Sequence, residues 1–378
     1  MESLFAVTAP GLESLAAQEL CAAGIVPDER AVALFPGGAA FAGDARALYS
    51  ANLTLRTASR VIVRLPEFRA AAFAELHKKA ARLPWGCFLA PGRPVAIRAT
   101  CRGSKLYHSE GVAERVLAGV GDNLGAPSPR VKPAGDDAAE PVQLILVRIV
   151  DDVCTISVDA SGALLHRRGY RLAVAKAPLR ETLAAAAILA SGWDRVSPLL
   201  DPFCGSGTIP IEAALLGSGR APGRSRRFAF MDWPSFDPAL WASVLAGAAP
   251  ATVRSTPIIL GTDRDAGAIR AAEKNAARAD VAAHVRLEQR AVSAIEPPPG
   301  PGFIVTNPPY GRRLRGQGDL RDLYARFGAV LRERCSGYRV AILCDDVALL
   351  NQTRLDLDAS FSFLHGGLKV RVGTGAIG

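Results

Sequence analysis

The stretch that decides the fold is Leu199-Leu200-Asp201-Pro202-Phe203-Cys204-Gly205-Ser206-Gly207-Thr208-Ile209-Pro210. A short apolar run ends at Asp201, a Gly-Ser-Gly turn follows, and a helix rich in Ala and Leu is predicted to begin near Ile209. Strand, tight loop and helix in this order are typical of the first crossover of an open parallel sheet, where ligands bind beyond the carboxyl ends of the strands. The glycines allow close approach of the backbone to a ligand, and the helix N-terminus presents unpaired N–H groups. The stretch predicts a doubly wound α/β domain, although any such domain can contain a turn of this kind.

A second motif follows another buried strand further along the chain. The apolar run Phe303–Thr306 ends in Asn307-Pro308-Pro309-Tyr310. Two prolines stiffen the loop and remove two donors, so its carbonyl groups face outward. The Asn307 amide oxygen and the Pro308 carbonyl can accept the two hydrogens of a planar amino group, while Tyr310 can stack on a base. An ordinary proline turn is the alternative, but the two motifs in this order favour methyl transfer to an exocyclic amine.

At these motifs the chain resembles the class I, S-adenosylmethionine (SAM)-dependent amino-methyltransferases. Four further stretches are more specific, namely Ala177–Ala185, Arg220–Gly223, Arg227–Trp233 and Gly366–Arg371. They resemble one bacterial branch, the THUMP-domain RNA guanine-N2 methyltransferases, and in particular the ribosomal RNA large subunit methyltransferase L family. The resemblance covers almost the whole chain. It implies an α/β, Rossmann-like doubly wound methyltransferase domain (161–378), preceded by an α+β ferredoxin-like domain (1–65) and a THUMP RNA-binding domain (66–160).

The resemblance also implies a reaction, the transfer of a methyl group from SAM to the exocyclic N2 of a guanosine in 23S rRNA. In this hypothesis the cofactor is held by the glycine loop, namely Asp201, Phe203, Cys204, Gly205, Ser206, Gly207 and Thr208. Asp263 is the last residue of the strand predicted over 258–263 and is placed to bind the ribose diol, while Asp265 caps the next helix. Asn307, Pro308, Pro309 and Tyr310 would hold the base.

Two positions depart from the family pattern. Ala291 stands where the family usually has an Asp that binds the adenine amine, and Arg312 follows the proline motif where relatives often have an acid. Backbone recognition of adenine and a weak cofactor affinity both remain open. The insert 217–250 contains Trp233 and Trp241, which we expect to pack over the edge of the site.

The basic residues are concentrated in the N-terminal half. The chain has a net charge of +9, and from Arg46 to Lys105 there are twelve Lys or Arg residues against two acids, Glu67 and Glu75. Such a segment is typical of a protein that binds a phosphate backbone, although a biased composition with solvated basic faces is the alternative. Within the parts that resemble the THUMP module and its exit, RNA contacts are predicted for Lys105, Tyr107, Arg167 and Arg168.

The N-terminal half is predicted to be α+β. Strand, helix, hairpin, helix and strand over residues 4–65 suggest a ferredoxin-like sandwich, in which Asp44 can cap the second helix. A helix, a strand, a second helix and a hairpin are then predicted over 73–82, 95–100, 109–124 and 142–159, with an exposed loop over 126–141.

Composition and cysteine spacing exclude several classes of protein. The 378 residues imply two or three domains, and no apolar run approaches the ~20 residues of a membrane span. The N-terminus lacks a secretory signal pattern. The seven cysteines include no Cys-x-x-Cys pair, so a zinc site has little support. We therefore expect a cytoplasmic, monomeric protein without a metal or a membrane partner.

Other functions remain open at this stage. A transfer RNA guanine-N2 methyltransferase of the same architecture fits nearly as well. DNA adenine and protein glutamine methyltransferases share the proline motif, but neither needs the basic half. An RNA-binding factor with a degenerate SAM site is a candidate from another class, whereas the glycine loop lacks the Gly-Lys-Ser/Thr of phosphate-loop NTPases. The methyltransferase hypothesis requires the glycine turn and the proline corner to open onto one shared cleft.

Overall fold

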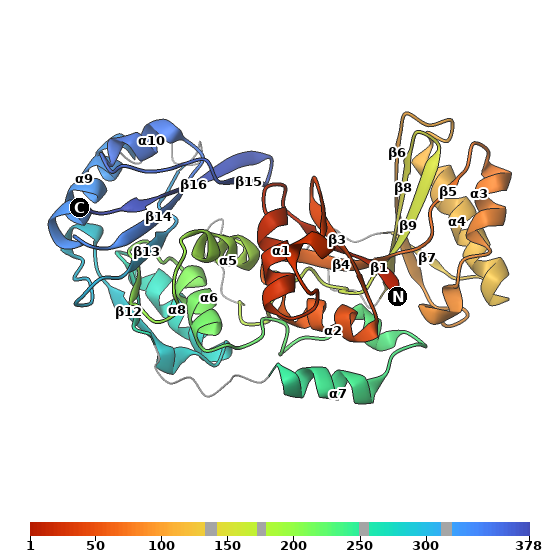
Figure 1. Ribbon diagram of the computed structural model, residues 1–378, viewed down its shortest axis with the longest axis horizontal. Coiled ribbons are helices and arrows are strands. Elements are labelled where there is room, and N and C mark those ends of the chain that lie inside the picture. The colour runs from red at the N-terminus through yellow and green to blue at the C-terminus, as the bar shows by residue number, and fades with distance from the viewer. Residues whose placement is uncertain (133–141, 172–178, 249–256, 311–319) are drawn as a thin grey trace.

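The computed structural model describes residues 1–132, 142–171, 179–248, 257–310 and 320–378. Figure 1 shows an elongated molecule in which the N-terminal strands and helices lie between a smaller β-rich part that contains α3 and α4 and a larger part that holds the C-terminus. The described strands form two sheets, one of nine strands and one of seven. No helix among these residues is both long and apolar enough to cross a bilayer. The described part of the chain also contains no group of three or more potential metal ligands.

The first part of the chain has the predicted ferredoxin-like order of elements. Strand β1 pairs with β3 on one side and with β4 on the other, in both cases antiparallel. Asp44 caps α2 through the Ala47 N–H at 2.9 Å, as the sequence predicted. The elements are β1 (Glu2–Thr8), α1 (Glu13–Ala22), β2 (Ala33–Phe35), β3 (Gly38–Gly43), α2 (Ala45–Thr54) and β4 (Ala58–Arg64).

The next part continues the same sheet. Strand β9 pairs with β4 of the first part and with β8, so the order is β2-β3-β1-β4-β9-β8-β6-β7, with β5 also on β9. The boundary predicted at residue 65 lies between β4 and β5, inside one continuous sheet. The elements are β5 (Phe68–Arg69), α3 (Phe73–Ala80), β6 (Val95–Arg102), α4 (Ser109–Leu124), β7 (Arg130–Val131), β8 (Gln143–Val150) and β9 (Val153–Asp159).

One short strand falls in a segment predicted as an exposed loop. Strand β7 pairs in parallel with Val95 and Ala96 of β6. Two residues give no periodic pattern, and their pairing depends on a partner distant in sequence. Residues 133–141 of that predicted loop lie outside the described residues.

The third part is the predicted doubly wound domain. Its sheet has the order β12-β11-β10-β13-β14-β16-β15, in which β10 to β14 are parallel and β16 is antiparallel to its neighbours. The elements are α5 (Glu181–Ala190), β10 (Leu199–Asp201), α6 (Thr208–Gly217), α7 (Pro238–Gly247), β11 (Ile259–Asp263), α8 (Ala266–Arg278), β12 (Val285–Gln289), β13 (Phe303–Thr306), α9 (Leu320–Arg334), β14 (Arg339–Cys344), α10 (Val347–Gln352), β15 (Ser362–His365) and β16 (Leu368–Ala376).

The insert after α6 does not pack over the edge of the site, so that prediction was wrong. Trp233 donates from its indole nitrogen to Gln143 Oε1 at 2.7 Å, and its ring meets Phe88 edge-on. Trp241 packs against the rings of Tyr49 and Phe230. The insert joins the apolar core of the N-terminal half, and Figure 1 shows α7 beneath α2.

Candidate active site

The two sequence motifs lie on neighbouring strands. Strand β10 pairs in parallel with β13, with Leu199 opposite Phe303 and Leu200 opposite Ile304. At the carboxyl ends, the Thr306 hydroxyl donates to Asp201 Oδ1 at 2.7 Å. The glycine loop and the proline corner therefore leave the sheet at the same edge, because parallel strands share the position of their carboxyl ends.

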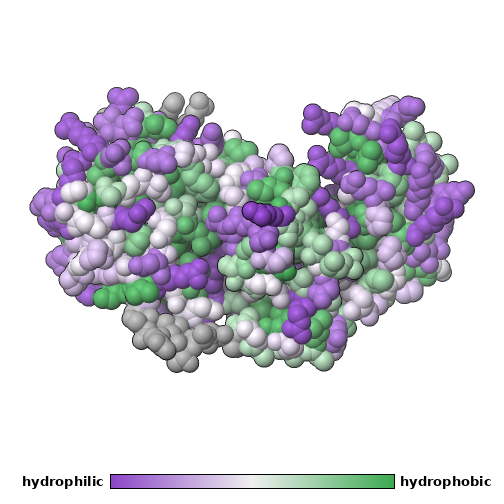
Figure 2. All heavy atoms as spheres, viewed as in Figure 1, coloured by the Kyte–Doolittle hydropathy of each residue, from purple (hydrophilic) through white to green (hydrophobic). Residues whose placement is uncertain are grey.

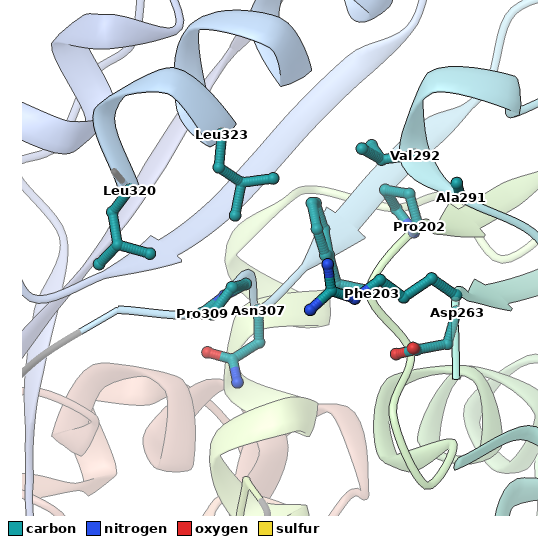
Figure 3. A pocket seen from close by; sticks show the side chains of 10 residues that line it. Pro202, Phe203, Asp263, Ala291, Val292, Asn307, Pro309, Leu320 and Leu323 are labelled. Carbon is teal, nitrogen blue, oxygen red and sulfur yellow. The ribbon is translucent and has the colours of Figure 1, made fainter. Parts of the chain in front are cut away.

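Residues from both motifs line one pocket, which confirms the predicted shared cleft. Figure 3 shows Asn307 and Pro309 on one side, Asp263 and Ala291 on the other, and Phe203 between them. The pocket has a volume of about 470 Å³, and its other lining residues are Pro202, Arg264, Val292, Leu320 and Leu323. Among all these described residues, Asp263 is the one acid.

The glycine loop is shaped for close approach. Gly207 has a φ of 85°, and a Cβ at this position would lie 2.9 Å from the Cβ of Ala272 on α8. The Gly205 N–H donates to Asp263 Oδ2 at 3.0 Å, and the Cys204 N–H donates to the Thr262 carbonyl at 3.0 Å. These bonds attach the loop to the end of β11. Direct contact of Cys204, Gly205, Ser206, Gly207 and Thr208 with a cofactor stays a prediction.

Asp201 lies beneath the loop instead of in the pocket wall. Its side chain is buried, and Oδ1 accepts from the Phe203 N–H at 3.1 Å as well as from Thr306. Burial raises the pKa of Asp201 to about 7, the two hydrogen bonds oppose the rise, and the charge of Asp263 adds to it. Within the described structure, Asp201 holds the loop to β13, and Phe203 is the neighbour that faces the pocket.

Asp263 and Asp265 have different roles at the end of β11. Asp265 Oδ1 accepts from the Gly267 N–H at 2.6 Å and so caps α8, as predicted. Asp263 is half-buried at the pocket, and its two oxygens accept from the N–H groups of Gly205 and Asp265. Each carboxylate oxygen has a second lone pair. Asp263 can therefore still accept hydrogen bonds from a diol, and its ribose contact stays a prediction.

The side of the pocket after β12 is apolar. Ala291 and Val292 line it, while the nearby Glu288 pairs with Arg290 at 3.0 Å and with Arg286. The pocket wall thus contains Ala291 at the position where the resemblance implies an Asp that binds the adenine amine. Arg312 lies outside the described residues.

Asn307 has an unused acceptor. The residue is half-buried, and its Oδ1 atom is buried without a hydrogen-bond partner among the described residues. Buried polar atoms are nearly always satisfied, and each exception calls for an explanation. An amide oxygen at the pocket wall that lacks a donor is suited to bind the hydrogen of an amino group.

Tyr310 does not line the pocket. It is half-buried and packs against the apolar clusters that contain Leu343 and Tyr324. Burial raises the pKa of Tyr310, and the nearby Cys344 and Asp345 raise it further. Its stacking on a base stays a prediction.

Two of the predicted RNA contacts are well exposed. Lys105 is exposed on the loop after β6, and Tyr107 retains 82% of its accessible surface, which is unusual for a tyrosine. A hollow of about 770 Å³, which no sequence pattern predicted, lies between β6 and α4 and is lined by Arg98, Arg130 and Lys132 among others. Figure 2 shows hydrophilic side chains gathered over this part of the molecule and a notch between it and the ferredoxin-like part.

Arg168 is a structural residue, so its predicted RNA contact was wrong. Its side chain is buried and donates to the carbonyls of Leu165 at 2.6 Å and Arg56 at 2.7 Å. It also lies 3.6 Å from Glu212 of α6. It thus joins the N-terminal half to the third part of the chain, and the sequence alone did not distinguish it from Arg167, which is half-buried.

Comparison with protein families matches all three parts of the chain. The family described as "RMKL-like, methyltransferase domain" matches residues 168–362. An RlmL ferredoxin-like domain matches residues 3–62, and a THUMP domain matches residues 70–159.

Individual relatives match this chain over nearly its whole length. A protein of Synechocystis described as a candidate RNA methyltransferase is 35% identical, over 96% of this chain and 94% of its own length. The ribosomal RNA large subunit methyltransferase K/L of Syntrophotalea carbinolica is 37% identical over 97% of this chain, which spans 53% of that protein. The crystal structure of SMU.472, a candidate methyltransferase in complex with S-adenosylhomocysteine (SAH), has a TM-score of 0.86 at 29% identity and covers 99% of this chain and 98% of its own.

Proposed function

The chain belongs to the RMKL-like RNA methyltransferases that also contain a ferredoxin-like and a THUMP domain, and we propose that it methylates the exocyclic N2 of a guanosine in 23S rRNA with SAM as the methyl donor. The K/L relatives are named for the large ribosomal subunit, and the chain spans about half their length. The observation that supports an amine as the methyl acceptor is Asn307 Oδ1, which is buried and has no hydrogen-bond partner within the described parts of the chain, at a pocket that the glycine loop also lines.

The residues around the pocket fit SAM. SAM supplies an activated methyl group when it is bound, so the protein contributes mainly positioning. Asp263 has free lone pairs at the place expected for the ribose, and Gly207 leaves room where a Cβ would collide with Ala272. The apolar surface of Ala291 and Val292 suits a flat adenine ring whose amine no carboxylate binds. The related SMU.472 structure, which contains SAH, supports this choice of cofactor.

Asn307 and Pro308 orient the acceptor. The amine of guanine is planar because its lone pair is delocalised into the ring. Acceptance of its two hydrogens by Asn307 Oδ1 and the Pro308 carbonyl turns the nitrogen lone pair toward the methyl group. The guanine must leave its stack to reach this corner, as in other enzymes that modify bases. The THUMP module, with its exposed Lys105 and Tyr107, would hold the surrounding RNA.

The test is a methylation assay on 23S rRNA from a strain that lacks this protein. Mass spectrometry of nuclease digests should find one N2-methylguanosine that depends on the enzyme. Asn307→Ala should lower the rate by about 100-fold or more while calorimetry shows unchanged SAM binding, since preorganised polar contacts at reacting groups contribute at this scale. The matched control is Asn351→Ala, on the exposed surface of α10.

Three results would contradict the proposal. Wild-type activity of Asn307→Ala would show that the amide does not hold the acceptor. Methylation of purified tRNA in place of 23S rRNA would move the substrate to the other guanine-N2 class. Absence of SAM binding by the wild-type protein would instead favour an RNA-binding factor with a degenerate SAM site.

A further inference from the structure

Asp345 has a carboxylate oxygen without a partner. It directly follows strand β14 and is half-buried, and its Oδ1 atom is buried with no hydrogen-bond partner among the described residues. Its neighbour Asp346 differs, because it is exposed and caps α10 through the Ala348 N–H at 2.8 Å. Burial of a carboxylate oxygen without a donor is unfavourable, and such a group indicates a binding partner that the described residues do not provide.

The topology places Asp345 on the acceptor side of Asn307. The residues assigned to the cofactor follow β10, β11 and β12, which all lie on one side of β13. Strand β14 lies on the other side of β13 and is parallel to it, with Thr306 opposite Ile342. A base whose amine is bound at Asn307 must face the cofactor from the opposite side. Its ring therefore extends toward the end of β14.

Two tyrosines lie near Asp345. Tyr310 lies close enough for the charge of Asp345 to contribute to the raised pKa of its phenol, after burial and Cys344. Tyr324 is fully buried and donates from its hydroxyl to Cys344 Sγ at 3.3 Å, so that hydroxyl already has a partner. Burial raises the pKa of Asp345 itself, its own backbone N–H opposes the rise, and the charge of Asp346 adds to it. A donor from a ligand would remove the cost of the buried charge.

We propose that the Asp345 carboxylate accepts the N1–H of the target guanine and thereby selects guanine as the base. This inference rests on the proposed function, because it takes the amine at Asn307 to be the guanine N2. With the two N2 hydrogens held by Asn307 and Pro308, N1–H is the remaining donor on that edge of the base. 2,6-Diaminopurine has the same N2 amine, but its N1 is an acceptor that would meet the carboxylate with a repelling lone pair. Asp345 is thus a specificity-determining residue.

The test uses synthetic RNA that contains the mapped nucleotide as either guanosine or 2,6-diaminopurine riboside. The wild-type enzyme should prefer guanosine by about 100-fold or more in kcat/KM, because a site built for a donor rejects an analogue that lacks it. Asp345→Asn should reduce this preference by about tenfold or more, since the amide can accept from guanine or donate to diaminopurine N1. Asp346→Asn is the matched control, because Asn caps a helix as well as Asp.

The outcomes separate this inference from the proposed function. Equal methylation of both RNAs by the wild-type enzyme overturns the role of Asp345 and requires no variant to fold. A wild-type preference retained by a folded Asp345→Asn, with thermal unfolding as the check, overturns it as well and shows that Asp345 serves only the packing beside Tyr310. Absence of N2-methylguanosine in the native RNA refutes the proposed function instead.

Discussion

At the scale of single residues, the most informative group is the carboxyl of Asp201. The sequence predicted that it contacts the cofactor, whereas the structure places it beneath the glycine loop. Asp201 joins the glycine loop to β13 through bonds to Phe203 and Thr306. Burial raises its pKa to about 7, from an ordinary value of 3.8. The folded protein therefore binds a proton at Asp201 over a pH range where the unfolded chain has released it. The contribution of Asp201 to the free energy of unfolding is therefore fully present below pH 4 and decreases as the pH rises toward 7.

Asp201→Asn should remove this pH dependence, because the amide stays neutral and retains an acceptor oxygen. We expect the free energy of unfolding of the variant, relative to wild type, to increase by roughly 2 kcal/mol between pH 5 and pH 8. Urea unfolding at both pH values measures the difference. The control is Asp265→Asn, at an exposed cap. A difference that does not change with pH would show that Asp201 is already ionised at pH 5.

At the scale of elements, the loop between β10 and α6 depends on one glycine. Gly207 combines a positive φ with contact to α8, so two separate costs oppose any side chain there. The loop can approach both its own neighbouring helix and a ligand because the Cβ is missing. The same element ties β10, β11 and β13 together at the pocket, through Asp263 and Asp201.

Gly207→Ala should lower the free energy of unfolding by about 2–4 kcal/mol, the sum of a left-handed backbone and an overpacked contact. SAM affinity measured by calorimetry should also fall, because relief of the clash shifts the loop. Gly192→Ala is the matched control, since Gly192 has a φ of 71° but no atom near its absent Cβ. It should lose only about 1–2 kcal/mol and bind SAM normally. Equal losses in both variants would exclude the contact with Ala272.

At the scale of the whole molecule, the residues predicted to contact RNA and the candidate active site lie in different parts of an elongated arrangement. The exposed Tyr107 and Lys105 belong to the THUMP module, beyond the ferredoxin-like part as seen from the pocket (Figure 1). Buried contacts hold the parts together, among them the bonds of Arg168 and those of the insert that contains Trp233. Because Tyr107 and the pocket lie in different parts of the fold, the effect of a substitution on RNA binding can be measured separately from its effect on SAM binding.

Tyr107→Ala should weaken RNA binding by about 1–3 kcal/mol, the value of one base stacked on an aromatic ring. SAM binding should remain unchanged, because the tyrosine lies far from the pocket in the fold. Tyr107→Phe keeps the ring and should bind RNA as wild type does, as measured by filter binding at fixed salt. A loss of affinity in the phenylalanine variant would point to the hydroxyl, and no loss in either variant would refute the contact.

The sequence by itself determined the local chemistry: the glycine turn after one strand, the proline corner after another, the caps by Asp44 and Asp265, and the basic N-terminal half. These features depend on neighbours in the chain, where backbone propensity and capping act directly.

Only the tertiary structure decided which side chains meet. It placed Asp201 under the loop, buried Arg168 between the halves and turned Trp233 toward the N-terminal core. It also buried Asp345 Oδ1 without a hydrogen-bond partner in the part of the chain that the structure describes. The physical reason is that burial and the loss of water around a polar group depend on residues far apart in sequence, which no local pattern records.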